Sequence, residues 1–274
     1  MKKFLVASAA VLGIVGTASA ADLGVRAPIV APPPVFSWTG IYIGIGGGTG
    51  WGEVNRTLKQ GVIAQGGGFP GVTFGNTFGS QSLSGGFFGG QLGANWQAGW
   101  AVFGIQGDAH WADIDGRGSC FDSGGFVGFS FGCDDKVNSF GSVTGRVGAA
   151  VDRALIYAKG GWAWEDSDVT VTPSGAGNFL GVGPSSITGF SQSQSRSGWT
   201  FGAGVEYAVV PNWSAFLEYN HFDFGSSDSN TVRTLSTPVG TFIVPISTSV
   251  TERFDVVKAG VNYKLNWWSA RAGY

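Results

Sequence analysis

GRVGAAVDRALIYAKGGWAW, residues 145–164, contains two runs of alternating side chains on either side of one tight turn, Asp152-Arg153. Small or apolar side chains occupy every second position: Val147, Ala149, Val151, Ile156 and Ala158. The positions between them include Arg146, Tyr157 and Lys159. A period of two is typical of β-strands, and a two-residue connection is typical of an antiparallel hairpin. This stretch therefore predicts a hairpin with one apolar face and one polar face.

The same pattern recurs along the chain after a proline-rich leader. Eight segments alternate in this way, each close to the length that a tilted membrane strand needs, about ten residues. They cover residues 38–51, 83–97, 100–111, 139–151, 154–165, 197–209, 213–224 and 251–265. The repeated pattern predicts an all-β protein rather than a mixture of helices and strands.

The connections between these segments alternate strictly in length. Long stretches occupy residues 52–82, 112–138, 166–196 and 225–250, whereas the links at 98–99, 152–153 and 210–212 are short. Short periplasmic turns and long outer loops are the plan of an outer-membrane barrel. The sequence thus predicts an eight-stranded antiparallel up-and-down transmembrane β-barrel over residues 37–265, with both chain ends on the periplasmic side.

The first twenty residues read as a secretory signal peptide. Lys2 and Lys3 precede an apolar core at residues 4–15, and Ala18-Ser19-Ala20 fits a small-residue cleavage site between Ala20 and Ala21. That core is too short to cross a bilayer as a helix. We expect a Pro-rich periplasmic linker at residues 21–36 and a C-terminal tail at residues 266–274.

The composition also points to a membrane barrel. The chain has 48 Gly, 21 Phe and 11 Trp, but only 12% charged residues, against about 25% in typical soluble domains. Without Lys2 and Lys3, 14 of the 16 basic residues remain against 18 acidic ones, a net charge of −4. There is no basic run, so nucleic acid is not an expected partner. No apolar stretch after the signal reaches about 18 residues, which leaves the closed barrel as the way to span a membrane.

Four motifs resemble a known family. They are SWTGIYIGIGGGTGWG (37–52), the hairpin at 145–164, WTFGAGVEYAVVPNWSAFLEYNHFDFGS (199–226) and FDVVKAGVNYKL (254–265). They are similar to the outer-membrane immunogenic β-barrel proteins of α-proteobacteria, a family of small porin-like barrels. The resemblance implies an abundant, often antigenic surface barrel of eight strands. That family often ends at an aromatic residue, so either Leu265 or Tyr274 marks the functional end of the last strand here.

Charged residues on the polar faces are expected inside the barrel, because Arg or Lys facing lipid near the midplane costs roughly 2–4 kcal/mol. These residues are Asp108, Arg146, Lys159, Glu165, Glu206, Glu218 and Lys258. An eight-stranded barrel is just wide enough for side chains to fill. We expect the three cations to pair with Asp108, Glu206 and Glu218 as a polar network that fills the lumen. A narrow path for water or ions through the same residues is the alternative.

The sequence gives little support for a nucleotide-binding or catalytic site. The run Gly44–Gly50 lacks the third glycine of a dinucleotide-binding loop, and no Walker lysine follows, so we expect no cofactor. We expect Gly44, Gly46 and Gly48 to face the lumen instead. His110 and His221 are the only histidines. His221 with a nearby serine and Asp223 would suit a lipid-deacylating enzyme, but a histidine at headgroup level is the simpler reading, and we expect no enzyme activity.

Cys120 and Cys133 are the only cysteines. An even pair in an exported protein predicts one disulfide, here closing a small part of the second long loop. Loop-closure entropy gives such a bond about 3 kcal/mol. Two thiolates alone do not make a zinc site, so no metal is expected.

Aromatic residues are expected to form two girdles at the membrane surfaces. The outer set is Trp51, Trp111, Trp162, Trp164 and Trp199, and the inner set is Trp38, Trp96, Trp100, Trp213 and Tyr263.

The expected function is a structural barrel that supports envelope integrity and presents large surface loops; a porin-like passive channel for water, ions or very small solutes is the alternative. Expected partners are outer-membrane lipid, the barrel-assembly machinery and an extracellular ligand at the loops.

Overall fold

The computed structural model describes residues 36–62, 73–74, 78–122, 130–174, 177–178, 184–187, 189–238 and 240–265. Eight long strands make up most of this part: β1 (Gly40–Val62), β3 (Phe78–Ala98), β4 (Ala101–Asp122), β5 (Ser130–Val151), β6 (Ala154–Ser174), β9 (Phe190–Val210), β10 (Trp213–Thr237) and β11 (Gly240–Leu265). Three short strands accompany them: β2 (Thr73–Phe74), β7 (Gly177–Asn178) and β8 (Pro184–Ile187). The predicted signal peptide, nearly all of the linker and the C-terminal tail lie outside the described residues.

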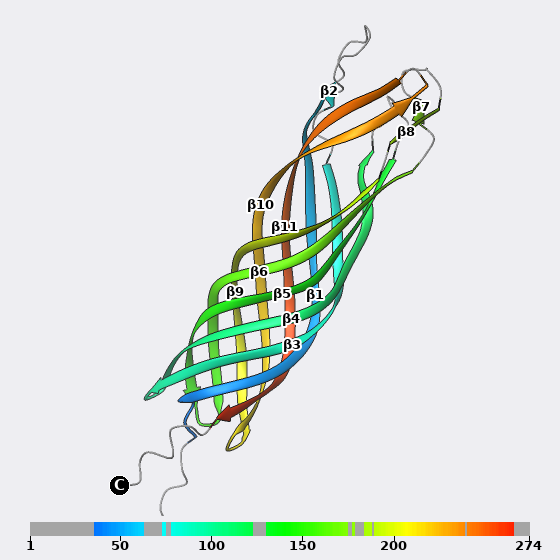
Figure 1. Cartoon of the computed structure of the whole chain (residues 1–274). Helices are drawn as coiled ribbons and strands as arrows, with labels where there is room; N and C mark the ends of the chain where they lie inside the picture. The colour runs from blue at the N-terminus through cyan, green and yellow to red at the C-terminus, as the bar shows by residue number, and fades with distance from the viewer. Residues whose placement is uncertain are drawn as a thin grey trace, which may run out of the picture. The chain divides into compact units, whose positions relative to one another are not determined.

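The eight long strands form a closed antiparallel ring, in the order β11-β1-β3-β4-β5-β6-β9-β10 and back to β11. Closure is direct, since Ile41 pairs with Leu265 on β11 and Trp213 on β10 pairs with Tyr263. β1 begins and β11 ends at the end of the barrel that carries the tight turns (Figure 1). The predicted eight-stranded up-and-down barrel is confirmed. Among the described residues, no helix is long and apolar enough to cross a membrane.

The tight turns depend on residues that tolerate a left-handed backbone. Asp152, between β5 and β6, has φ 51°, and Gly99, between β3 and β4, has φ 62°. Glycine adopts positive φ at little steric cost, and Asp is among the few other residues that do so readily. These turns fix the register of the hairpins at this end.

The strands are much longer than predicted. They run for 21 to 26 residues, and β10 and β11 stay paired up to Thr237 and Gly240. The prediction that 225–250 is a loop was therefore wrong, and much of the other three predicted loops is also strand. Beyond the membrane the outer face of a strand meets water rather than lipid, so the contrast of apolar and polar positions fades while backbone pairing continues.

The outer wall carries an apolar belt, as the alternation predicts. Exposed side chains on it include Ile43, Ile45, Phe88, Leu92, Ile105, Val147, Ile156, Phe201, Val205 and Leu217. Trp51, Trp111, Trp162 and Trp199 are exposed toward the far end, and Trp96, Trp100 and Trp213 toward the tight turns. Trp38 departs from the prediction of an inner girdle anchor. It is buried against Val102, Leu155, Tyr157 and Ala208, where it fills the barrel at the tight-turn end.

Candidate functional site: the filled interior of the barrel

The six residues of the predicted polar network are all buried in the lumen. They are Asp108, Arg146, Lys159, Glu206, Glu218 and Lys258, with relative exposures between 2% and 6%. Each comes from a different strand: β4, β5, β6, β9, β10 and β11 contribute one residue each. Three are cationic and three are anionic, so their formal charges cancel. We refer to them, with the tyrosines and amides that bond them, as the lower polar layer.

Glu218 is one hub of this layer. Its Oε2 lies 3.0 Å from the Nζ of Lys159 and 3.0 Å from the Nζ of Lys258. Its Oε1 accepts a hydrogen bond of 2.6 Å from the hydroxyl of Tyr157. Asp108 is more loosely tied, with an Oδ2 at 3.5 Å from Lys159 Nζ. Buried charges are tolerated only when paired and hydrogen-bonded in this way.

Glu206 is the second hub. Its Oε2 lies 2.9 Å from Nη2 of Arg146, and its Oε1 accepts bonds from Ser214 Oγ at 2.5 Å and Asn262 Nδ2 at 2.8 Å. Arg146 also donates from Nη1 to the Tyr42 hydroxyl at 2.8 Å. That hydroxyl in turn donates to Gln106 Oε1 at 2.7 Å. Gln106 Nε2 donates to Asp108 Oδ2 at 3.3 Å, and Asp108 lies beside Lys159 of the first hub, so the two hubs are connected.

The glycines of β1 make room for this layer. A Cβ on Gly44 would collide with the side chain of Asn262, and one on Gly46 would lie 2.9 Å from Phe216 Cζ. Asn262 needs its position, because it bonds both Glu206 and Gln91. Gly44 and Gly46 face the lumen as predicted, and an amide and an aromatic ring occupy the space that they leave.

An aromatic layer lies beyond the lower polar layer, toward the far end. Phe140 is at its centre, with its ring centroid 5.1 Å from that of Phe87, 5.4 Å from Phe222 and 5.4 Å from Phe254. All four rings are buried. Val54, Leu83, Ile114, Val137 and Val256 pack around them. This apolar cluster fills the lumen of the described barrel with side chains that offer no hydrogen bonds to water.

Sequence reasoning missed this layer, although a signal was present. On β5, Phe140 shares the inward face with Ser142, Thr144 and Arg146; on β10, Phe222 follows Glu218 and Asn220 on the same face. Each polar face therefore changes to phenylalanine at the same depth. Comparing the inward-facing residues of different strands at the same depth would have predicted the aromatic layer.

A second polar layer lies beyond the aromatic one. Arg56 of β1 forms a bidentate ion pair with Asp135 of β5, with Nη1 2.7 Å from Oδ2. Arg196 Nη1 on β9 lies 2.9 Å from Glu252 Oε2 on β11. Glu165, which the sequence placed in the lumen, is fully buried here rather than in the lower polar layer. Arg56, Asp135 and Arg196 were missed because they fell in stretches predicted to be loops.

The two histidines lie on opposite sides of the barrel wall, His110 inside and His221 outside. His110 is buried, stacked on Phe140 at 4.9 Å between centroids, with Nδ1 3.6 Å from Asp108 Oδ1. His221 is half-buried on the outer wall, and its Nδ1 is 2.7 Å from Asp255 Oδ1, which also accepts a 2.6 Å bond from the Tyr219 hydroxyl. Its acidic partner is thus Asp255 and not the predicted Asp223, which instead bonds Arg253.

The cysteines do not lie in a loop, contrary to the prediction. Cys133 is buried on β5 and its backbone pairs with Gly118 on β4, two residues before Cys120. The side chain of Cys120 is outside the described part of the structure. The disulfide stays a prediction. The pairing of β4 and β5 at Gly118 and Cys133 brings the two cysteine backbones close together, which favours the bond.

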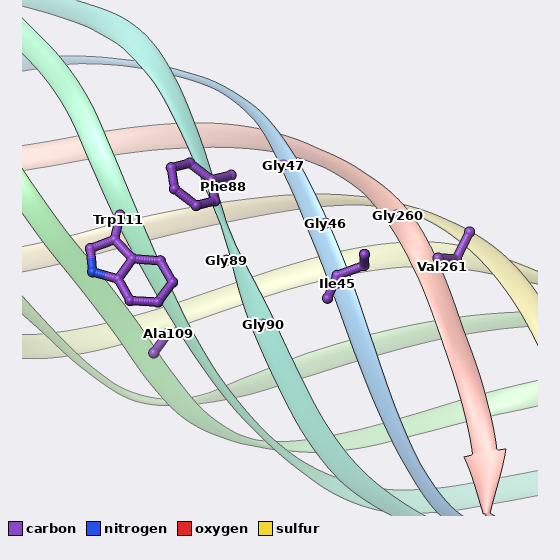
Figure 2. A pocket seen from close by; sticks show the side chains of 10 residues that line it. All are labelled: Ile45, Gly46, Gly47, Phe88, Gly89, Gly90, Ala109, Trp111, Gly260 and Val261. Carbon is purple, nitrogen blue, oxygen red and sulfur yellow. The ribbon is translucent and has the colours of Figure 1, made fainter.

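One shallow apolar groove lies on the outer wall (Figure 2). Ile45, Phe88, Trp111 and Val261 project around it, and glycines of β1 and β3 form its floor. A Cβ on Gly90 would meet its nearest neighbour at 3.6 Å, so this part of the wall is open. It belongs to the apolar belt and carries no polar side chain among its lining residues.

Comparisons with known proteins agree with this geometry. The chain is 32% identical to the 31 kDa outer-membrane immunogenic protein of Brucella melitensis biotype 1, over 97% of this chain and 100% of that protein. It is 30% identical to a 22 kDa outer membrane protein of Rhizobium leguminosarum bv. viciae, over 71% and 68%. It is 25% identical to the 25 kDa outer-membrane immunogenic protein of Brucella abortus biovar 1, over 97% and 99%.

The family model described as "Outer membrane protein beta-barrel domain" matches residues 7–264, which is nearly the whole chain. The relatives named as outer-membrane proteins and the closed ring of eight strands give the same location and fold. The chain is an outer-membrane protein and belongs to the outer-membrane β-barrel family.

Proposed function

We propose that this barrel has a structural role in the envelope, and that it presents the outward extensions of its strands as a surface that antibodies and extracellular partners can bind. One observation carries this proposal: the lumen is filled. The lower polar layer, whose six charged residues balance, is followed by the aromatic layer around Phe140.

The filled lumen favours a structural role over conduction for a physical reason. An ion that enters the aromatic layer loses its hydration shell and gains no polar partner, which is costly in an apolar environment. The lower polar layer offers no compensation, because its hub carboxylates Glu206 and Glu218 are already bonded to cations.

The surface role is supported by the relatives and by the strand lengths. Two of the Brucella relatives carry the description immunogenic in their names. The paired extension of β10 and β11 runs to Thr237 and Gly240, well beyond the exposed tryptophans. Outer-membrane lipid around the apolar belt and the barrel-assembly machinery are the partners that such a barrel requires.

Planar-bilayer recording of the purified, refolded protein tests the lumen. We expect no conductance steps above those of the empty bilayer at 1 M KCl. Steady steps that change when Arg146→Gln and Lys159→Gln neutralise the lumen would overturn the structural proposal in favour of the passive channel.

A deletion strain tests the envelope role. We expect the strain to become more sensitive to detergent and to large antibiotics, and the wild-type gene to restore resistance. Unchanged sensitivity, together with a silent bilayer, would leave surface presentation as the role, which flow cytometry of intact cells with antibodies to the folded protein measures directly.

A further inference from the structure

The segment directly before β1 turns into the barrel instead of continuing along its wall. Residues 36–39 belong to no strand, yet Trp38 is only 4% exposed. The residues that share its apolar cluster are Val102 of β4, Leu155 and Tyr157 of β6, and Ala208 of β9. In the ring of eight long strands, β6 lies four places from β1 and is therefore opposite to it. The Trp38 ring thus reaches across the lumen, and we call residues 36–38 the N-terminal plug.

Two polar contacts hold the plug at the rim of the barrel. On β3, the side-chain oxygen of Gln97 accepts a hydrogen bond of 2.8 Å from the backbone N–H of Trp38. On β11, Lys264 Nζ donates to the carbonyl oxygen of Ser37 at 2.5 Å and lies 4.5 Å from the centroid of the Phe36 ring. That ring meets the Trp38 ring edge to face, with 4.9 Å between the centroids. The plug is therefore held by side chains, and no backbone ladder has to break for it to move.

Gly40, the first residue of β1, connects the plug to the wall. Its φ of 143° is a conformation that residues with a side chain rarely adopt, whereas glycine reaches it at little steric cost. The chain changes direction here, from the wall into the lumen. A rotation of the backbone at this residue would move the plug and leave the paired part of β1 in place.

A small polar cavity lies between the plug and the lower polar layer. The residues that line it include Phe36 and Trp38 of the plug, Lys264 at the rim, and Tyr42, Asn95, Glu206, Ser214 and Asn262 of the lumen. Its volume of about 10 Å³ is close to what one water molecule requires. The cavity therefore has the size and the polar lining of a site for a single water molecule.

Two polar atoms on the lining residues have no hydrogen-bond partner in the described structure. They are Trp38 Nε1, which is a donor, and Asn95 Oδ1, which is an acceptor. Both residues are more than nine-tenths buried, with exposures of 4% and 7%. Buried donors and acceptors are rarely left unpaired, and a buried water molecule commonly satisfies such a pair.

We propose that one buried water molecule occupies this cavity and fastens the N-terminal plug to the interior of the barrel. The water accepts a hydrogen bond from Trp38 Nε1 and donates one to Asn95 Oδ1. Its second O–H is available to Glu206, the carboxylate among the lining residues. The plug closes the tight-turn end of the lumen and shields the lower polar layer from the periplasm. When the plug swings out about Gly40, solvent reaches that layer without any change in the wall.

This inference goes beyond the proposed structural role and does not depend on it. The plug closes the tight-turn end of the lumen, whereas the aromatic layer around Phe140 lies on the other side of the lower polar layer. A barrel that conducts ions and one that does not could both contain the plug and its water. The tests below therefore measure the water and the plug and not conductance.

Nuclear magnetic resonance of the refolded, isotope-labelled protein in detergent micelles tests the water. The signal of the Trp38 indole N–H is identified by its loss in Trp38→Phe. In the unaltered protein we expect a rotating-frame cross peak between this proton and water, with the sign of a long-lived bound molecule and not of proton exchange. Asn95→Leu removes the acceptor at similar size and should abolish that peak while the other indole signals keep theirs. A missing peak in the unaltered protein, or a peak that persists in Asn95→Leu, would overturn the proposed water.

Exchange of the same indole proton with D2O tests the plug. Lys264→Met removes the contacts to Ser37 and Phe36 at a similar side-chain length, and we expect exchange at least tenfold faster. The matched control is Lys59→Met, because Lys59 is exposed and pairs with Asp228 on the outer wall; its exchange should stay within twofold of the unaltered protein.

The heat-modifiable band of a folded barrel is checked for every variant before exchange is measured. If Lys264→Met does not fold, Gln97→Leu takes its place, because it removes the contact to the plug on β3, and the same tenfold increase is expected. Unchanged exchange in the folded variant, or an equal increase in Lys59→Met, would show that these contacts do not hold a movable plug.

Discussion

The guanidinium of Arg146 lies 3.8 Å from the centroid of the Tyr157 ring, while the hydroxyl of the same tyrosine donates to Glu218 at 2.6 Å. Tyr157 thus serves two charges of opposite sign, one over its face and one at its edge. Since Arg146 also pairs with Glu206 at 2.9 Å, this tyrosine connects the two hubs of the lower polar layer. The layer behaves as one network rather than as separate ion pairs.

Tyr157→Phe separates the two roles of this residue, because the ring face under Arg146 remains and the bond to Glu218 is lost. Hydrogen bonds to charged groups contribute about 1.5–3 kcal/mol, and we expect a loss of that size in the free energy of unfolding in urea. Tyr219→Phe is the control, since its hydroxyl bonds Asp255 at 2.6 Å on the outer wall. Equal losses for the two variants would contradict a special role of the buried network.

Glu218→Gln leaves two buried ammonium groups without the carboxylate they share. Lys159 and Lys258 each lie 3.0 Å from Glu218 Oε2, and breaking a buried pair by removing one partner costs about 3–5 kcal/mol. The matched change on the surface is Asp228→Asn, opposite the exposed Lys59, where about 0–1 kcal/mol is expected. Unfolding in urea, followed by tryptophan fluorescence, measures both. A loss below 1 kcal/mol for Glu218→Gln would show that the lysines find other partners.

Phe140→Ala removes the ring at the centre of the aromatic layer. Large-to-small changes at buried Phe cost about 3–5 kcal/mol, because the neighbours relax only partly around the cavity. We expect a loss of that size, and a lumen that admits water at this depth, as measured by hydrogen exchange of the amides around Phe140. Phe88→Ala on the lipid-facing wall removes the same ring without opening the lumen, and should leave that exchange unchanged.

Gly44→Val tests the space that glycine leaves for Asn262. The added Cβ would lie 2.9 Å from the carbonyl oxygen of Val261 and would collide with the Asn262 amide. We expect most of the variant to fail to form the compact, heat-modifiable band on an unboiled gel. Gly86→Ala is the control, since its Cβ would meet nothing closer than 3.8 Å. A normal yield of folded Gly44→Val would mean that the network rearranges freely.

The predicted Cys120–Cys133 disulfide is tested by mass spectrometry of the non-reduced protein and by its reduction. A bond closing so short a stretch stabilises by about 3 kcal/mol in the loop-entropy treatment. Cys120→Ser should therefore lower the protease resistance of the ends of β4 and β5 and leave the barrel folded. Two free thiols in the exported protein would refute the bond.

The barrel could be predicted from the sequence because lipid on one side and a filled lumen on the other impose a strict period of two. Gln106, Asp108 and His110 alternate with Ile105, Ala109 and Trp111, and the structure gives each its expected face. The tight turns could be predicted too, because only two or three residues separate the alternating segments at 98–99, 152–153 and 210–212. The structure has a short turn at each of these places.

What the sequence did not reveal is the length of the strands and the order of layers along the lumen. Ser193, Ser195, Asp228 and Asn230 show no apolar alternation, so pairing had to be seen in the backbone. The partners of a buried charge depend on which strands meet at one depth. Arg56 and Asp135 are 79 positions apart along the chain, and no local pattern connects them.

The long ladder beyond the membrane changes what the immune system would meet on this surface. At about 3.3 Å per residue, a strand of 25 residues such as β10 is far longer than the ten or so needed to cross a bilayer. The outermost part is thus a pleated sheet in which neighbouring side chains come from distant positions, such as Lys59 beside Asp228. Antibodies to it would recognise such composite epitopes, which short linear peptides or a boiled antigen would not reproduce.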